Sequence, residues 1–201
     1  MIKNIQIQLV EPDPVALIRV NYNTEDLEES IAKQGQLQPV LVYKKGEKYY
    51  VYVGVRRYFA IKRLCEKHGK PCEIKAEIEE KEPDQETKFM RMADENGKRD
   101  DLTLYEKLFL ILFRGDIGEV FVKRKVISEN FKKEAQRLIQ YNVTEEDLKR
   151  WYDIEMKVSM KVKLTLEHIK KIVELDDKEE RDFAVAVLSF LETPVKLIGD
   201  F

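Results

Sequence analysis

The sequence predicts an α+β fold, with a mixed α/β half over residues 1–100 and an all-helical half over residues 101–201. In the first half, short runs of alternating apolar residues are interspersed with stretches of helical periodicity. In the second half the helical pattern continues without strand signals. Because the pattern changes near residue 100, we place a domain boundary there.

The predicted strands of the first half are short segments in which apolar and polar residues alternate. They are Ile5–Leu9, Pro39–Tyr43, Tyr49–Val53 and Cys72–Ile78, the middle two placed around a turn at Lys45-Gly46-Glu47. Three helices are expected between and after them. Asn23 or Thr24 caps the first, which ends at Gly35. The second follows Gly54 and stops at Gly69, and the third passes through Phe89, Met92 and Ala93 to end near Gly97.

In the second half, residues with N-capping character mark the starts of helices. Thr103 and Glu106 form a capping box, and Thr144 with Asp147 and then Thr165 mark later starts. The apolar residues assigned to successive helices are Leu108–Phe113, then Phe131, Ala135, Leu138 and Ile139, then Leu148, Trp151 and Tyr152, and then Ile169, Ile172 and Val173. A last helix is expected over residues 178–192, before Pro194.

Charge and apolar content limit the class of protein. The formal net charge is −2, so the total shows no general electrostatic attraction to nucleic acid. Residues 118–163 nevertheless hold 11 Lys/Arg against 8 Asp/Glu, and we expect any DNA contact there. No apolar run approaches the roughly 20 residues of a membrane span, and the N-terminus lacks a signal-peptide pattern. We therefore expect a cytoplasmic protein with no membrane contact.

The cysteines and histidines argue against a zinc site. Cys65 and Cys72 are not spaced as a CxxC pair, and His68 and His168 are far apart in the sequence. We expect the two cysteines to be ordinary thiols in a reducing compartment.

The segment Tyr49–Arg63 has the character of an anion-binding helix start. A strand ends at Gly54, where the backbone can approach a ligand closely, and the free N–H groups of the following helix favour an anion. Arg56 and Arg57 add donors that match phosphate oxygens. The alternative is a pair of surface arginines that open a solvated helix.

Two further segments have ligand-binding character. Glu95 and Asn96, at a helix end, are hard oxygen ligands suited to Mg²⁺ beside phosphates, and Arg99 is placed to reach the same phosphates. Gln38 and Pro39, in a loop that enters a strand, offer an amide and an apolar surface to a nucleobase. The alternatives are a charged helix terminus and a simple helix–strand connection.

In order and character, these segments resemble the N-terminal domain of the ParB partition proteins, a ParB/sulfiredoxin-like fold. The family pattern, an arginine followed by four boxes, is met over about residues 5–105 by Arg19, Leu27–Ile31, Gly35–Val42, Gly54–Arg57 and Glu95–Leu102. The last box matches in full. The glutamate that the family places after the glycine is Val55 here.

The resemblance implies a site for CTP and Mg²⁺. By analogy, the phosphates are held by Gly54, Arg56 and Arg57 with Arg99 nearby, the metal by Glu95 and Asn96, and the base is bordered by Gln38 and Pro39. Valine can neither bind a metal nor orient water, so the resemblance does not extend to hydrolysis, and weak CTPase activity stays open. A cysteine at that position would mark the sulfiredoxin branch, which Val55 excludes.

Residues 129–153 fit helix-turn-helix spacing, and in the ParB family the second helix of such a motif reads DNA. Here that helix opens with the acidic run Thr144–Asp147, which repels phosphate. The candidate DNA contacts are the basic residues around it, namely Lys123, Arg124, Lys125, Lys132, Lys133, Lys149 and Arg150. The alternative is a helical bundle with a solvated charged face.

The resemblance as a whole implies a nucleotide-gated DNA-binding protein of plasmid or chromosome partition, associated with the nucleoid or a plasmid. It would clamp on DNA as a homodimer and have a ParA-type motor ATPase as a partner. Two alternatives stay open. One is a nuclease or small-molecule kinase on the same fold, with Glu28, Glu29 or Glu95 as acidic candidates. The other is a protein-interaction module that binds no nucleotide.

Overall fold

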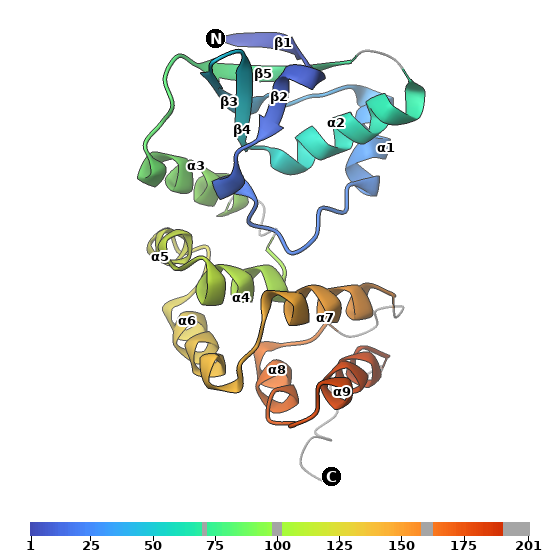
Figure 1. The fold of residues 1–201 in the computed structure, drawn as a ribbon, viewed down its shortest axis with the longest axis vertical. Coiled ribbons are helices and arrows are strands. Elements are labelled where there is room, and N and C mark those ends of the chain that lie inside the picture. The colour runs from blue at the N-terminus through green and yellow to red at the C-terminus, as the bar shows by residue number, and fades with distance from the viewer. Residues whose placement is uncertain (70–71, 98–101, 158–162, 191–201) are drawn as a thin grey trace. The chain divides into compact units, whose positions relative to one another are not determined.

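The computed structural model describes residues 1–69, 72–97, 102–157 and 163–190. The chain divides into two compact units, Met1–Arg99 and Asp100–Phe201. The first contains a five-stranded sheet with helices, and the second is helical (Figure 1), so the predicted α+β class is confirmed. Among the described residues, no helix has the length and apolar character needed to cross a bilayer.

The sheet of the first unit is mixed, with strand order β1-β5-β3-β4-β2. Its strands are β1 (Ile2–Gln6), β2 (Val10–Pro12), β3 (Val40–Lys45), β4 (Lys48–Val53) and β5 (Glu73–Glu79). β1 pairs antiparallel with β5, and β3 with β4, whereas the β3–β5 and β2–β4 pairs are parallel. The predicted strands around the turn at residues 45–47 and the strand before residue 80 are therefore confirmed.

The predicted strand Ile5–Leu9 is wrong in its second half. β1 ends at Gln6, and Ile7–Leu9 forms a short 3-10 helix before β2. Ile7 is buried but Leu9 is exposed, so the alternation of apolar residues does not mark one continuous buried face. The 3-10 helix redirects the chain between β1 and β2, which lie at opposite edges of the sheet.

The three predicted helices of the first unit are present: α1 (Glu25–Gln34), α2 (Val55–His68) and α3 (Gln85–Gly97). The side chain of Asn23 accepts a hydrogen bond from the backbone of Glu25 at the start of α1. Gly35 and Gly69, both with positive φ, end α1 and α2, which pack against each other.

α3 lies over the sheet face that carries Tyr43 and Tyr52. The buried ammonium group of Lys88 lies 2.8 Å from the carboxylate of Asp13 and 4.2 Å from the centre of the Tyr43 ring. Arg91 on α3 hydrogen-bonds to the hydroxyl of Tyr52. Because successive strand residues point to opposite faces, Val42 and Val51 point away from α3. α2 packs against β3 and β4.

Cys65 and Cys72 form a disulfide, with their Cα atoms 5.7 Å apart. The expectation of two free thiols is therefore wrong. The spacing of the two cysteines gave no sign of the bond, which forms because the chain turns after α2 and brings the start of β5 back beside the end of that helix.

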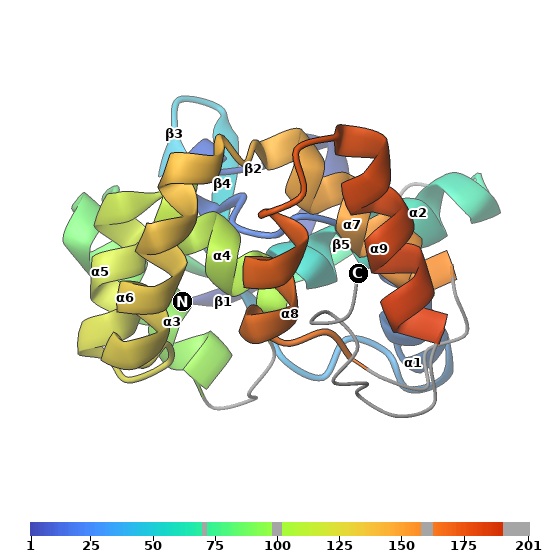
Figure 2. The ribbon, with the colours of Figure 1, turned by 90° about the horizontal axis from the view of Figure 1, so that it is seen from below.

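The second unit contains the helices α4 (Leu104–Phe113), α5 (Gly115–Lys123), α6 (Glu129–Gln136), α7 (Glu145–Lys157), α8 (Leu166–Ile172) and α9 (Lys178–Phe190). The capping box of Thr103 and Glu106 is confirmed, and Thr165 also caps its helix. Trp151 on α7 is fully buried, and α9 lies beside α7 (Figure 2). The predicted extension of the last helix, residues 191–192, lies outside the described residues.

Two features of this unit differ from the prediction. α6 ends at Gln136, and a 3-10 helix, Arg137–Tyr141, follows it and leaves Ile139 exposed. α5 was not predicted, because Gly115 and Gly118 lower its helical propensity. Gly118 has a packing role, since a Cβ there would lie 2.7 Å from a backbone carbonyl oxygen of α4.

Candidate functional site

Three of the segments predicted to bind nucleotide meet at the start of α2. The N–H group of Gly54 donates to Oε2 of Glu95 at 3.3 Å, and the guanidinium of Arg57 lies 3.4 Å from Oε1 of the same carboxylate. Arg57 also donates to the carbonyl of Pro39 at 2.9 Å and to the side-chain oxygen of Gln38 at 3.3 Å. We call the Gly54 N–H group and the Arg57 guanidinium the anion cradle.

Glycine is required in the cradle for two reasons. Gly54 caps α2 with a φ of 87°, in the left-handed region that glycine reaches without strain. A Cβ at this position would lie 2.7 Å from a guanidinium nitrogen of Arg57 and 3.0 Å from a methyl group of Val40. The absence of a side chain therefore lets the backbone N–H group and the guanidinium lie close together.

Burial makes the cradle a preorganised site. The side chain of Arg57 is only 9% exposed, whereas that of Glu95 is 26% exposed. A guanidinium taken out of water must be paired and hydrogen-bonded. The carbonyl of Pro39 and the amide of Gln38 hold it in place, and the charge it retains faces the carboxylate of Glu95.

Arg56, the neighbouring arginine, makes different contacts. Its guanidinium donates to the carbonyl of Asn23 at 3.2 Å and to the carboxylate of Asp26 at 3.3 Å, both at the start of α1. The structure thus brings Arg57 to Glu95 and places Arg56 against α1. Arg99, predicted to reach the same phosphates, lies outside the described residues.

Asn96 is buried and held by two hydrogen bonds. Its side-chain oxygen accepts from Arg19 at 3.0 Å, and its amide donates to the carbonyl of Met92 at 2.7 Å. Arg19 was not among the predicted site residues. Its place as the opening arginine of the family pattern was the available signal.

Glu95 and Asn96 fit Mg²⁺ in the chemistry of their oxygen donors. A small hard cation commonly takes one or two ligands from the protein and completes its octahedral shell with water and phosphate oxygens. Among the described residues, no cluster of three or more His, Cys, Asp or Glu side chains is placed to hold a metal ion. Glu95 and Asn96 would supply the one or two protein ligands that such a cation takes.

The predicted DNA contacts lie on several elements of the second unit. Lys123, Arg124 and Lys125 are exposed at the end of α5, and Lys133 on α6 and Lys149 on α7 are exposed too. Lys132 forms an ion pair with Glu119. Lys125 has a φ of 59°, a left-handed conformation that is unfavourable for a lysine.

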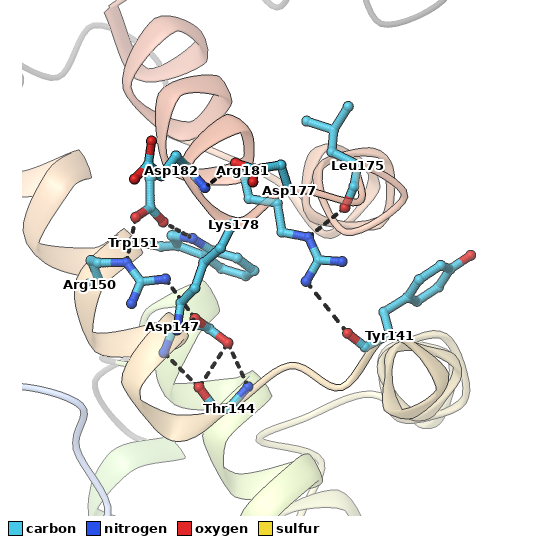
Figure 3. Close-up of polar contacts among 11 residues, drawn as sticks. Tyr141, Thr144, Asp147, Arg150, Trp151, Leu175, Asp177, Lys178, Arg181 and Asp182 are labelled. Atoms are coloured by element: carbon cyan, nitrogen blue, oxygen red, sulfur yellow. Dashed lines mark hydrogen bonds and ion pairs between the residues drawn. The ribbon is translucent and has the colours of Figure 1, made fainter.

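Arg150, the remaining candidate, is tied to other residues of its unit (Figure 3). Its guanidinium lies 2.6 Å from the carboxylate of Asp147 and also binds Asp182 on α9. Burial alone would raise the pKa of Asp147. Hydrogen bonds from Thr144 and Arg150, with one from Lys178, outweigh it and lower the pKa to about 2. The role of Arg150 in DNA binding stays a prediction, and the structure gives it a packing role as well.

Arg181 on α9 joins three backbone carbonyl groups, and Figure 3 shows its contacts to Leu175 and Tyr141. Arg181 donates to the carbonyls of Leu175 at 2.7 Å and Val173 at 2.9 Å, and it reaches the carbonyl of Tyr141 at 3.5 Å. Tyr141 is the first residue of the turn predicted for the helix-turn-helix, Tyr141–Val143, so α9 holds the end of α8 and this turn together.

Comparison with known proteins finds relatives of the first unit. Residues 1–92 match the sequence profile of the ParB N-terminal domain. The probable chromosome-partitioning protein ParB of Campylobacter jejuni is 28% identical over 184 residues, covering 88% of this chain. The chain spans 60% of the length of that curated relative.

Solved structures of ParB proteins are similar as well. The Pnob8-like ParB-N domain aligns with a TM-score of 0.50 and 17% identity, over 92% of each chain, and shows the fold. The C-terminally truncated ParB of Caulobacter crescentus, solved in complex with CTP-gamma-S, aligns with a TM-score of 0.41 and 18% identity, over 92% of this chain and 99% of that chain. Residues 1–92 are thus similar in sequence to the ParB N-terminal domain family.

Proposed function

We propose that the first unit binds CTP with Mg²⁺, and that the bound nucleotide controls how the chain engages DNA in plasmid or chromosome partition. The observation that carries this proposal is the convergence of three separate motifs on the anion cradle, since Gln38 and Pro39, Gly54 and Arg57, and Glu95 are in direct contact. The match of residues 1–92 to the ParB N-terminal domain supports it.

Each predicted residue has a proposed role. The cradle binds phosphate oxygens with the help of Arg56 and Arg99, and Gln38 and Pro39 border the base. Glu95 and Asn96 would hold Mg²⁺, which would supply positive charge to offset that of the phosphates. Val55 is buried and supplies no group that orients water, so we assign nucleotide binding and leave hydrolysis unassigned.

Calorimetric titration with CTP, ATP and GTP, each with and without Mg²⁺, tests the proposal. We expect CTP to bind most tightly and to require Mg²⁺. Arg57→Lys keeps the charge but removes the two-pronged donor, and should weaken CTP binding about tenfold or more. Arg63→Lys is the matched control, because Arg63 lies on the same helix but contacts Thr24. A chain that binds none of the three nucleotides would overturn the proposal.

The second unit is proposed to contact DNA through phosphate-binding basic residues. The candidates are Lys123, Arg124, Lys125, Lys132, Lys133, Lys149 and Arg150. The strained backbone of Lys125 supports this assignment, because unfavourable left-handed residues concentrate at functional sites. Binding to a duplex should weaken steeply as salt rises. An affinity that is unchanged between low and high salt would argue against phosphate contacts.

We propose that the chain acts as a homodimer that closes on DNA when CTP is bound, associated with the nucleoid or a plasmid in the cytoplasm, with a ParA-type ATPase as partner. Analytical ultracentrifugation with and without CTP and duplex DNA tests the dimer. We expect a doubled mass in the presence of nucleotide. A monomer under all of these conditions would contradict the clamp.

A further inference from the structure

The anion cradle already holds an anion that belongs to the protein. The carboxylate of Glu95 accepts from Gly54 through one oxygen and lies against Arg57 through the other. A backbone N–H group at a helix start and a guanidinium are the donors that a phosphate group would use. Glu95 therefore stands where a phosphate oxygen of the proposed ligand is expected.

These contacts are long enough to be exchanged. At 3.3 Å and 3.4 Å they are longer than the 2.9 Å hydrogen bond by which Arg57 is anchored to Pro39. Charge-assisted hydrogen bonds of full strength measure about 2.7–2.9 Å. Arg57 is thus held firmly by a neutral carbonyl and more loosely by the carboxylate, so an incoming phosphate can replace Glu95 without releasing the guanidinium.

The position of Glu95 is set by the whole of α3. Lys88, Arg91 and Glu95 follow one another at spacings of three and four residues, so they share one face of the helix. Lys88 binds Asp13, and Arg91 binds Tyr52 on β4, two residues before Gly54. These two ties fix α3 against the sheet and direct Glu95 to the end of β4.

We propose that Glu95 is a built-in competitor of phosphate for the anion cradle. Its carboxylate excludes a bare polyphosphate and admits a polyphosphate that carries a divalent cation. The inference rests on the proposed nucleotide site and deepens it. A carboxylate in the cradle repels a free polyphosphate, whereas a cation that binds both groups converts the repulsion into attraction. The residue thereby determines which charge state of the ligand binds.

Binding of inorganic tripolyphosphate in the presence of EDTA separates this role from that of a metal ligand. Glu95→Gln removes the negative charge and keeps the shape. We expect this variant to bind metal-free tripolyphosphate about tenfold more tightly than the wild type, because the ligand no longer has to displace a charged acceptor. A residue that only holds metal would leave metal-free binding unchanged. Glu86→Gln, an exposed glutamate on the same helix, is the control and should behave as the wild type.

Two more measurements complete the test. Adding Arg57→Lys to Glu95→Gln should abolish the tighter binding of metal-free tripolyphosphate, because the tripolyphosphate binds to the anion cradle. Thermal unfolding of each variant, recorded with and without tripolyphosphate, verifies folding and gives a second measure of binding. If Glu95→Gln binds metal-free tripolyphosphate no better than the wild type, the inference is overturned.

The outcome for the nucleotide is independent. A wild type that binds CTP with Mg²⁺, together with a Glu95→Gln variant that gains nothing in EDTA, would overturn the competitor role and leave the proposed function standing. The opposite result is that Glu95→Gln gains tripolyphosphate binding while the chain binds CTP, ATP and GTP no more tightly than tripolyphosphate. This result would support the competitor role and overturn CTP as the ligand.

Discussion

The carboxylate of Asp182 on α9 accepts a hydrogen bond of 2.9 Å from the indole nitrogen of Trp151 on α7 (Figure 3). Trp151 is fully buried and is the one tryptophan of the chain. The other oxygen of Asp182 binds Arg150. The helix proposed to face DNA is thus fixed by the last described helix of its own unit.

Replacing Asp182 should therefore destabilise the second unit. Asp182→Ala leaves the buried indole N–H group without its partner and removes an ion pair, so we expect the free energy of unfolding to fall by about 2–3 kcal/mol. Urea unfolding followed by the fluorescence of Trp151 reports on this unit directly. Asp176→Ala removes an exposed carboxylate nearby and should change little. Equal losses in the two variants would show that the contact to Trp151 is not what stabilises the unit.

Asp147 should make the second unit sensitive to acid. Hydrogen bonds from Thr144 and Arg150 outweigh burial and lower its pKa from 3.8 to about 2. A carboxyl with a lowered pKa stabilises the fold fully above its unfolded pKa, and this contribution is lost as the pH falls from about 4 towards 2. The shift corresponds to about 2 kcal/mol.

The matching experiment compares the wild type with Asp147→Asn between pH 6 and pH 3. We expect the wild type to be more stable by about 2 kcal/mol at pH 6, with the difference narrowing towards pH 3. Glu179→Gln, which changes an exposed acid on α9, is the control. A difference that stays constant over this range would contradict the assignment.

Much of the fold followed from local signals. The strands β3, β4 and β5 and the three helices of the first unit were predicted because alternation, caps and glycine stops agree along the chain. β2 was not predicted, because a strand of three residues is too short to show alternation. β1 was misjudged because it runs from Ile2 to Gln6 and the chain then leaves one edge of the sheet for the other, a property of sheet order that no local pattern carries. α5 was missed because Gly118, which weakens a helix, is required by close packing against α4.

The site was predictable in its residue types but not in its pairings. The motifs singled out Gly54, Arg57 and Glu95, which the structure brings into contact. Arg56 has the same chemistry as Arg57, but the helix turns it towards α1, which only the fold decides. The contact of Arg19 with Asn96 joins residues 77 positions apart, a distance that sequence reasoning cannot bridge.

The disulfide should stabilise the first unit. It links Cys65 to Cys72, seven residues apart, and a loop of this size is expected to contribute about 2–3 kcal/mol by restricting the unfolded chain. Adding reductant should lower the unfolding midpoint followed by circular dichroism, while the Trp151 signal of the second unit stays unchanged. A Cys65→Ser/Cys72→Ser double variant should not respond to reductant. Two titratable thiols in the untreated chain would disprove the bond.

Lys125 offers a test in which stability and DNA binding should move in opposite directions. Its φ of 59° is costly for a lysine and free for a glycine, so Lys125→Gly should stabilise the second unit by about 0.5–1 kcal/mol. The same change removes an exposed cation and should weaken binding to duplex DNA by a few-fold, with a shallower dependence on salt.

Two variants complete that comparison. Lys125→Asn tolerates the same backbone conformation and also lacks the charge, so it should follow Lys125→Gly in both measurements. Lys81→Ala removes an exposed lysine of the first unit and should leave DNA affinity unchanged. If Lys125→Gly gains stability at no cost in DNA affinity, the strained lysine serves another purpose. If the strained conformation of Lys125 is kept for DNA binding, Lys125→Gly must both stabilise the second unit and weaken DNA binding. The strain is then what holds the charge of Lys125 in position.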